Sequence, residues 1–269
     1  MNTQLADYIA NETRARDSTL TVGLCGAQGS GKSTVAAALT TLLEARGITA
    51  AVISIDDLYL TRRERLALAE SIHPLLRTRG VPGTHDVALG LETLRALATP
   101  GAVALPSFDK ARDDRRPADL WPTVHAPVQV IILEGWCVGA VAQDEASLLE
   151  PVNALERDLD ADGTWRRTVN RSLAGPYRPL FAMLDRLILL KAPDFEIVYR
   201  WRLEQEHKLR EQVGAAGGDL SRVMDDGEVE HFIGHYERLT RHILHEMPSR
   251  ADVVVTLDEL RRPRSVAFR

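Results

Sequence analysis

Gly26-Ala27-Gln28-Gly29-Ser30-Gly31-Lys32-Ser33-Thr34 is the run that decides the fold. It reads Gly, four residues, then Gly-Lys-Ser, between an apolar run at 20–25 and a helical pattern at 34–44. Glycines in such a loop let backbone N–H groups approach phosphate oxygens, and the N-terminus of the next helix adds partial positive charge. The pattern predicts that these nine residues bind a nucleotide, with Lys32 on the β and γ phosphates and the Ser33 hydroxyl on Mg²⁺. The alternative is a glycine-rich turn that binds nothing.

Length and composition are those of an ordinary globular protein. The chain has 269 residues, of which 45% are hydrophobic and 26% charged. The formal net charge is −5, so we expect neither a nucleic acid nor an anionic membrane as partner. Cys25 and Cys137 have no metal-ligand spacing and form no disulfide framework. The sequence has neither an apolar signal core nor a run of about 18 apolar residues, so it predicts a cytoplasmic enzyme with reduced cysteines. It does not predict the oligomeric state.

Strands alternate with helices along the chain. Apolar runs predict strands at 20–25, 50–55, 128–133, 186–190 and, as the last, 253–257; the run at 128–133 is typical of a central strand buried on both faces. Helical spacing predicts helices at 2–16, 87–98, 195–211 and 228–247. We therefore expect residues 1–269 to form a single α/β domain of the phosphate-loop NTPase class, a three-layer sandwich with helices on both faces of a parallel sheet.

Several segments interrupt this alternation. Residues 58–86 combine Arg, His and Asp with a turn cluster, and 107–125 begin with charges of both signs, so we expect two insertions that face a substrate; solvated loops are the alternative. A short strand is expected at 102–106, irregular structure over 141–180 and a flexible break at 214–218. Residues 194–247 are expected to form a helical lid in which Arg200 and Arg202 supply cations, with a solvated, ion-paired helix face as the alternative.

Two carboxylates follow predicted strands. Asp56 comes after the strand at 50–55, and Glu134 comes after the strand at 128–133. The carboxyl ends of parallel strands meet at the edge of the sheet where ligands bind. A kinase that phosphorylates a hydroxyl group often uses a carboxylate to accept its proton, and Asp56 is placed for that role. We expect Ser33, Asp56 and Glu134 to hold Mg²⁺, although a helix-capping or turn acid is the alternative for Glu134.

Six further segments are distinctive: Ser54-Ile55-Asp56-Asp57-Leu58-Tyr59-Leu60-Thr61, Arg79-Gly80-Val81-Pro82-Gly83-Thr84-His85-Asp86, Phe108-Asp109-Lys110 with Asp114-Arg115, Glu134-Gly135-Trp136, Trp201-Arg202-Leu203-Glu204-Gln205-Glu206 and Met224-Asp225-Asp226. On these segments the chain resembles the D-glycerate 3-kinase family, the plant-type glycerate kinases with bacterial and fungal relatives. Those kinases are phosphate-loop enzymes related to phosphoribulokinase, uridine kinase and bacterial pantothenate kinase. The resemblance extends from Gly23 to Pro263, and the run from Arg79 to Asp86 is its most specific part.

The resemblance implies ATP-dependent phosphorylation of the 3-hydroxyl of D-glycerate, a small-molecule substrate, to give 3-phosphoglycerate. It implies that Lys32 is catalytic, that Asp56 is the base and that Arg202 is a lid cation. The acceptor-side residues that it implies are Asp57, Tyr59, Arg79, His85, Asp86, Asp109, Lys110 and Arg115. A carboxylate substrate needs a cationic partner, for which Arg79, Lys110 and Arg115 remain open.

The chain departs from the family pattern in two places. Leu58 stands where phenylalanine is usual, and Cys137-Val138-Gly139 stands where a larger apolar residue is expected. The first alternative is therefore a kinase of the same architecture for another acceptor, such as pantothenate, a nucleoside or a sugar phosphate. The second is a nucleotide-dependent switch with no acceptor, against which the Asp56–Asp57 pair and the acceptor-side segments argue.

Overall fold

A six-stranded sheet forms the centre of the computed structural model, which describes residues 1–215 and 223–269. Its strand order is β10-β9-β8-β1-β7-β2. The strands are β1 (Leu20–Gly26), β2 (Ala50–Ser54), β7 (Val130–Gly135), β8 (Arg186–Lys191), β9 (Val253–Leu257) and β10 (Pro263–Phe268). The first five are parallel, whereas β10 pairs antiparallel with β9. β1 and β7 are buried along their whole length, as strands covered on both faces must be.

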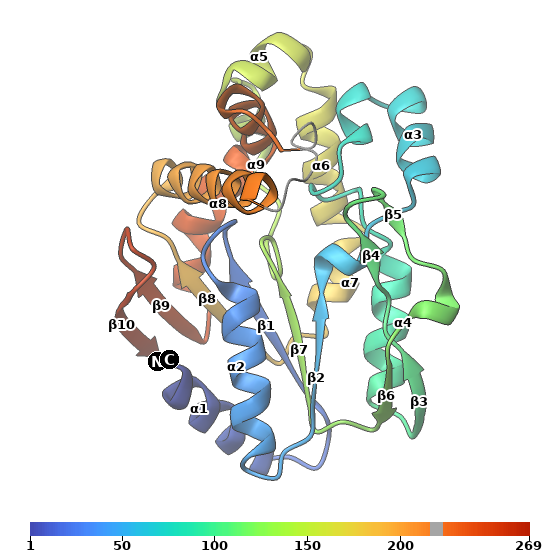
Figure 1. The fold of residues 1–269 in the computed structure, drawn as a ribbon, viewed down its shortest axis with the longest axis vertical. Helices are drawn as coiled ribbons and strands as arrows, with labels where there is room; N and C mark the ends of the chain where they lie inside the picture. Colours follow the sequence, from blue (N-terminus) through green and yellow to red (C-terminus); the bar gives the residue numbers. More distant parts are fainter. Residues whose placement is uncertain (216–222) are drawn as a thin grey trace.

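Helices cover the sheet, and the predicted α/β phosphate-loop fold is confirmed. Figure 1 shows α2 (Lys32–Glu44) in front of the strands and α7 (Tyr177–Phe181) behind them. α1 (Asn2–Arg14) packs against α2, and α4 (Val87–Leu97) packs against α7. Within residues 1–215 and 223–269, no helix combines the length and the hydropathy that a bilayer crossing needs.

Most of the remaining elements lie beyond the carboxyl ends of the parallel strands (Figure 1). A 3₁₀ turn, Ile55–Leu58, continues β2, and α3 (Arg62–Ser71) follows it. β4 (Phe108–Asp109) and β5 (Asp114–Arg115) form a small hairpin, and β3 (Gly101–Ala104) pairs with β6 (Thr123–Ala126). Farther along the chain are α5 (Ala154–Leu159), α6 (Thr164–Ala174), α8 (Phe195–Ala215) and α9 (Asp226–Glu246).

The structure corrects the expectation of irregular structure over 141–180. This region contains α5, α6 and α7, and buried ion pairs hold its helices in place. Arg166 lies 3.0 Å from Asp160, which also accepts hydrogen bonds from the first turn of α6. Arg238 of α9 lies 2.6 Å from Glu156 of α5. Glu156 and Arg238 are 82 residues apart, so local spacing could not reveal that pair. Asp160 and Arg166 are six residues apart, and α6 buries Trp165, Arg166, Asn170 and Leu173 on one face at helical spacing.

The structure corrects or refines four smaller expectations. β9 is not the last strand, because β10 extends the sheet antiparallel at its edge. The strand expected at 102–106 is β3, and it pairs with β6 in a separate two-stranded sheet. The charged segment after it contains the β4–β5 hairpin. The break expected at 214–218 falls partly outside the described residues, since α8 continues through Ala215 and residues 216–218 are not described.

Candidate active site

The phosphate loop connects β1 to α2 and begins the candidate site. Gly29 and Gly31 have φ angles of 77° and 83°, a left-handed conformation that a side chain would strain. Lys32 is the first residue of α2 and lines a cavity of about 340 Å³. The cavity is formed by Gln28, Gly29, Lys32, Asp56, Tyr59, Arg79, Lys110, Trp136, Arg202, Gln205, Phe232 and Tyr236. The three side chains predicted to be catalytic, Lys32, Asp56 and Arg202, therefore share one cavity.

Asp56 is the one acid among the lining residues given above, and both oxygens of its carboxylate accept hydrogen bonds. The Tyr59 hydroxyl donates to Oδ1 at 2.7 Å, and the Lys110 ammonium donates to Oδ2 at 2.7 Å. Burial raises the pKa of Asp56, but the charges of Lys110 and Lys32 and the two hydrogen bonds outweigh it and bring that pKa to about 2. Asp56 is thus ionised at neutral pH, and each oxygen keeps a lone pair for a further donor.

Ser33 and Glu134 meet beside the phosphate loop. Glu134 is 4% exposed, and its Oε1 accepts a hydrogen bond from the Ser33 hydroxyl at 3.0 Å. Its other oxygen, Oε2, is buried and has no hydrogen-bond partner among the described residues. β2 pairs with β7 so that Ser54 lies opposite Glu134, and Asp56 follows two residues later. A hydroxyl group, a buried carboxylate oxygen without a partner and a nearby aspartate fit a Mg²⁺ ion that also takes phosphate oxygens and water.

Arg79, expected on the acceptor side, lines the cavity. Its guanidinium forms an ion pair with Asp113 and lies 5.6 Å from the Phe108 ring centroid. The Tyr236 hydroxyl donates to the Arg79 carbonyl oxygen at 3.2 Å and so fixes its backbone. Asp113 is held in a left-handed conformation by Arg65, which donates to its carbonyl oxygen and lies 2.9 Å from its carboxylate. Arg79 is therefore oriented but still half-buried at the cavity wall.

Four of the expected acceptor-side residues support the surrounding backbone, and the cavity lining given above does not include them. Asp57 accepts a hydrogen bond from the Phe108 N–H at 3.0 Å, and Asp109 accepts bonds from the backbone of its own turn. Asp86 caps α4 and lies 3.0 Å from Arg115, which also donates to the Tyr59 carbonyl oxygen. These contacts hold the walls of the cavity together, so a direct role with the acceptor stays a prediction for all four.

His85 lies behind Tyr59 and is buried. The two rings stack with centroids 4.7 Å apart, and His85 Nδ1 lies 2.5 Å from the Tyr177 hydroxyl. The Tyr177 hydroxyl also accepts the Gly83 N–H, and His85 Nε2 is buried with no hydrogen-bond partner among the described residues. Burial lowers the pKa of His85 to about 4, so the ring is neutral at pH 7. His85 thereby supports the Tyr59 ring, whose hydroxyl binds Asp56.

The two arginines expected to supply cations differ in position. Arg202 lines the cavity, lies 2.6 Å from Glu206 and stands 5.5 Å from the Phe232 ring centroid. Arg200 instead points to the β9–β10 turn, where it lies 3.4 Å from Glu259, and it is largely exposed. The α8 helix therefore directs one of the two cations to the phosphate loop.

A comparison with protein-family models identifies the family of the chain. Residues 21–196 match the model of the phosphoribulokinase / uridine kinase family, which is more than half of the chain. The chain belongs to this family. The resemblance expected from its motifs is thus confirmed, and the protein is a phosphate-loop kinase, a phosphotransferase.

Individual relatives of this kinase carry related names. It is 32% identical over 243 residues to the uncharacterized kinase mug58 of Schizosaccharomyces pombe, covering 87% of this chain and 84% of that protein. It is 32% identical over 262 residues to the chloroplastic D-glycerate 3-kinase of Arabidopsis thaliana, covering 91% of this chain and 54% of the plant protein. The solved structure of the D-glycerate 3-kinase from Cryptococcus neoformans aligns with a TM-score of 0.78 at 25% identity, covering 100% of this chain and 99% of the fungal one.

Sequence reasoning missed several residues of the kinase's cavity. Trp136, Gln205, Phe232 and Tyr236 line it, and Asp113 and Glu206 hold Arg79 and Arg202. Trp136, Gln205 and Glu206 lie within the distinctive segments, so the motifs could have pointed to them. Phe232 and Tyr236 belong to the apolar pattern of α9, which gives no sign that part of this face lines a cavity.

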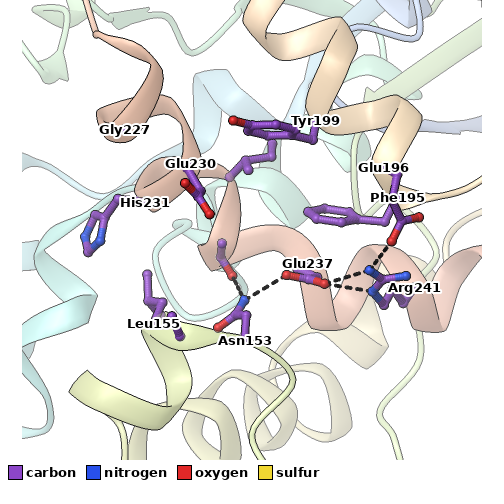
Figure 2. Close-up of a pocket in the computed structure, with 13 residues that line it drawn as sticks. Asn153, Leu155, Phe195, Glu196, Tyr199, Gly227, Glu230, His231, Glu237 and Arg241 are labelled. Atoms are coloured by element: carbon purple, nitrogen blue, oxygen red, sulfur yellow. Dashed lines mark hydrogen bonds and ion pairs between the residues drawn. The ribbon is translucent and has the colours of Figure 1, made fainter.

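A second, larger cavity lies away from the phosphate loop. It measures about 520 Å³ and is enclosed by the start of α5, the first turns of α8 and one face of α9. Figure 2 shows a chain of contacts on one side of it, from Asn153 through Glu237 and Arg241 to Glu196. Arg241 lies 2.6 Å from Glu196 and 2.8 Å from Glu237, and Asn153 donates to Glu237 at 3.1 Å. These contacts join α8 to α9 through Glu196 and Arg241, and α5 to α9 through Asn153 and Glu237.

Proposed function

We propose that this kinase transfers the terminal phosphoryl group of ATP to the 3-hydroxyl of D-glycerate. One observation carries the proposal: a carboxylate and an arginine, Asp56 and Arg79, line one cavity with the phosphate-loop lysine, Lys32. That set matches an acceptor that carries a hydroxyl at one end and a carboxylate at the other. The relatives named D-glycerate 3-kinase, one of which aligns with the whole chain, support the same acceptor.

The phosphate loop would bind the nucleotide. Backbone N–H groups of the loop and the N-terminus of α2 would hold the phosphates, and the Lys32 ammonium would neutralise charge on the transferred group. Ser33, Glu134 and Asp56 would hold Mg²⁺, and the unpartnered Oε2 of Glu134 is the group that most needs such a partner. The ion would supply neutralisation of charge on the phosphate oxygens.

Asp56 would accept the proton of the acceptor hydroxyl. As the hydroxyl oxygen forms its bond to the γ phosphorus, the bond from that phosphorus to the bridging oxygen breaks and ADP leaves with those electrons. The hydroxyl proton passes to Asp56 and then to solvent. The low pKa of Asp56 keeps it ionised and ready, and Tyr59 holds one of its oxygens in a fixed orientation. Arg202 would stabilise charge that spreads over the transferred phosphoryl oxygens.

Arg79 would bind the carboxylate of the acceptor. All three cations left open by the sequence are ion-paired, but Arg115 is not among the residues that line the cavity, and the Lys110 ammonium binds the Asp56 carboxylate that would act as base. Arg79 remains on the cavity wall with a planar guanidinium, which suits two-point binding of a carboxylate. Its ion pair with Asp113 would restrict the guanidinium, which lowers the entropy cost of binding a carboxylate.

Substrate discrimination tests this assignment. Glycerol carries hydroxyl groups but no carboxylate, so wild-type kcat/KM for D-glycerate should exceed that for glycerol. Arg79→Ala should lower kcat/KM for D-glycerate by about 10- to 150-fold, because a hydrogen bond to a charged group contributes about 1.5–3 kcal/mol. The same variant should leave kcat/KM for glycerol unchanged. Arg112→Ala is the matched control, since Arg112 lies in the β4–β5 hairpin next to Asp113, the ion-pair partner of Arg79, with 84% of its side chain exposed. Equal losses for both acceptors in Arg79→Ala would contradict the assignment.

A further inference from the structure

The turn between β9 and β10 contacts the phosphate loop through one side chain, Arg261. Its Nε donates to the carbonyl oxygen of Gly29 at 2.8 Å. Its Nη2 lies 2.6 Å from Glu204 of α8, and its guanidinium lies 5.3 Å from the centroid of the Trp201 ring. One planar cation thus touches the loop that binds phosphate and the helix that carries Arg202. Figure 1 shows this turn beside α8.

The turn is built to present Arg261 in this position. Arg261 has φ 64°, a left-handed conformation unusual for a residue with a side chain. Its N–H donates to the carbonyl oxygen of Asp258, whose carboxylate accepts the N–H groups of Leu260 and Arg262. The Trp201 indole N–H donates to the Glu259 carbonyl oxygen at 2.6 Å, which fastens α8 to the same turn.

The phosphate loop and α8 also touch directly. A Cβ on Gly29 would lie 2.7 Å from the Cβ of Trp201, closer than two such atoms approach, so Gly29 allows the loop to pack on the helix. Arg202 follows Trp201 in the sequence and lines the active-site cavity. Whatever fixes Trp201 against Gly29 therefore also fixes the distance from Arg202 to the phosphate loop.

We propose that Arg261 is a positioning residue for phosphoryl transfer, which sets Arg202 against the phosphate loop by binding Gly29 and Glu204 together. The proposal rests on the proposed function, in which Arg202 stabilises the transferred phosphoryl group. Arg261 lies outside residues 21–196, the part matched by the family model. Displacement of a catalytic group by about 1 Å can cost about 100-fold in rate, so loss of Arg261 acts on turnover more than on substrate binding.

Steady-state kinetics with a double-mutant cycle test this role. Arg261→Ala should lower kcat by about 10- to 100-fold and change KM for the acceptor by less than about threefold. Arg261→Lys, which can reach Glu204 but cannot contact both partners with a planar group, should restore part of the loss. Because Arg261 acts through Arg202, the Arg202→Ala/Arg261→Ala variant should be no slower than Arg202→Ala. Arg262→Ala, an exposed neighbour, is the control and should keep wild-type kcat. Additive losses in the cycle would overturn the proposal.

Hydrogen exchange tests the contact without any acceptor. In Arg261→Ala, backbone amides of residues 29–34 and 201–206 should exchange faster together, whereas Arg262→Ala should leave both segments unchanged. If wild-type protein does not phosphorylate D-glycerate, the proposed function fails, but this measurement still decides whether Arg261 holds the two segments together. Unchanged exchange in Arg261→Ala would refute the positioning role.

Discussion

Replacement of Glu134 by glutamine should make the free enzyme more stable and the kinase reaction slower. Glu134 is buried, one of its oxygens accepts the Ser33 hydroxyl, and the other has no partner among the described residues. Glutamine has nearly the same shape and can still accept the Ser33 bond. It exchanges a buried negative charge, whose Oε2 has no hydrogen-bond partner among the described residues, for a neutral amide, and an unpaired charge costs more to bury than an unpaired neutral group, by about 1–2 kcal/mol.

The size of the effect follows from these contacts. We expect the free energy of unfolding of Glu134→Gln to rise by about 1–2 kcal/mol in EDTA. For a domain of this size that corresponds to an increase in Tm of about 2–6 °C. Mg·ATP at about 100 times Kd should stabilise the wild type by about 2.7 kcal/mol, and Glu134→Gln by less, because an amide is a poorer ligand for Mg²⁺ than a carboxylate. Turnover should fall by about 100-fold or more.

Thermal unfolding in EDTA and in Mg·ATP, with turnover measured in parallel, checks both halves of this prediction. Glu156→Gln is the matched control, because Glu156 is also fully buried but accepts two hydrogen bonds from Arg238. That replacement should destabilise the protein by about 3–5 kcal/mol and leave turnover of the folded fraction unchanged. A lower Tm of Glu134→Gln in EDTA, or full Mg²⁺-dependent activity, would refute the reasoning.

Three further predictions concern proton transfer and pH. Asp56→Asn should keep nucleotide binding, measured by Tm shift, and lose about 10²- to 10⁴-fold in single-turnover rate; normal activity would exclude Asp56 as the base. Lys110→Met should raise the pKa of Asp56 from about 2, so the acid limb of kcat/KM should move to higher pH; an unmoved limb would show that Lys110 does not hold this carboxylate. The folded-state pKa of His85, about 4, lies below its ordinary value of 6.5, so its contribution to stability is complete above pH 6.5 and is lost as pH falls toward 4. His235, whose pKa burial also lowers to about 4, contributes a loss of the same sign, so the test by urea unfolding is a difference between variants: the loss of unfolding free energy from pH 7 to pH 5 should be about 2 kcal/mol smaller in His85→Leu than in wild type and in the exposed-site control His125→Asn, and an equal loss in all three would contradict it.

Much of the fold could be predicted from the sequence, because its central features are local. The phosphate loop is one uninterrupted motif, and β1 and β7 are apolar runs buried on both faces. α5 could not be predicted in this way, because it is six residues long and its buried Glu156 is bound by Arg238 of α9. α6 does have helical spacing, but two of its four buried residues, Arg166 and Asn170, are polar, and this weakens the apolar stripe that indicates a helix. β10 is an edge strand with mostly exposed side chains, so it lacks the alternation that indicates a strand.

The sequence predicted which residues belong to the candidate site better than it predicted where their side chains point. Motifs indicated Lys32, Asp56, Arg79 and Arg202, and all four line one cavity. The same motifs indicated Asp86, whose side chain caps a helix. A charged residue in a distinctive segment can bind a substrate or hold the wall around it, and only three-dimensional contacts separate these roles. Residues such as Asp113 reach the site through an ion pair that sequence spacing does not reveal.

The most direct test of the central claim is the product formed from Mg·ATP and D-glycerate. ADP release should be measured with D-glycerate, L-glycerate, pantothenate, uridine and ribulose 5-phosphate, and the phosphorylated product identified by ³¹P NMR. We predict strong stimulation by D-glycerate alone, with 3-phosphoglycerate as the product. Stimulation by another of these acceptors, or a product phosphorylated at the 2-hydroxyl, would contradict the proposed acceptor chemistry. Slow turnover that no acceptor stimulates would contradict the assignment to any of these acceptors.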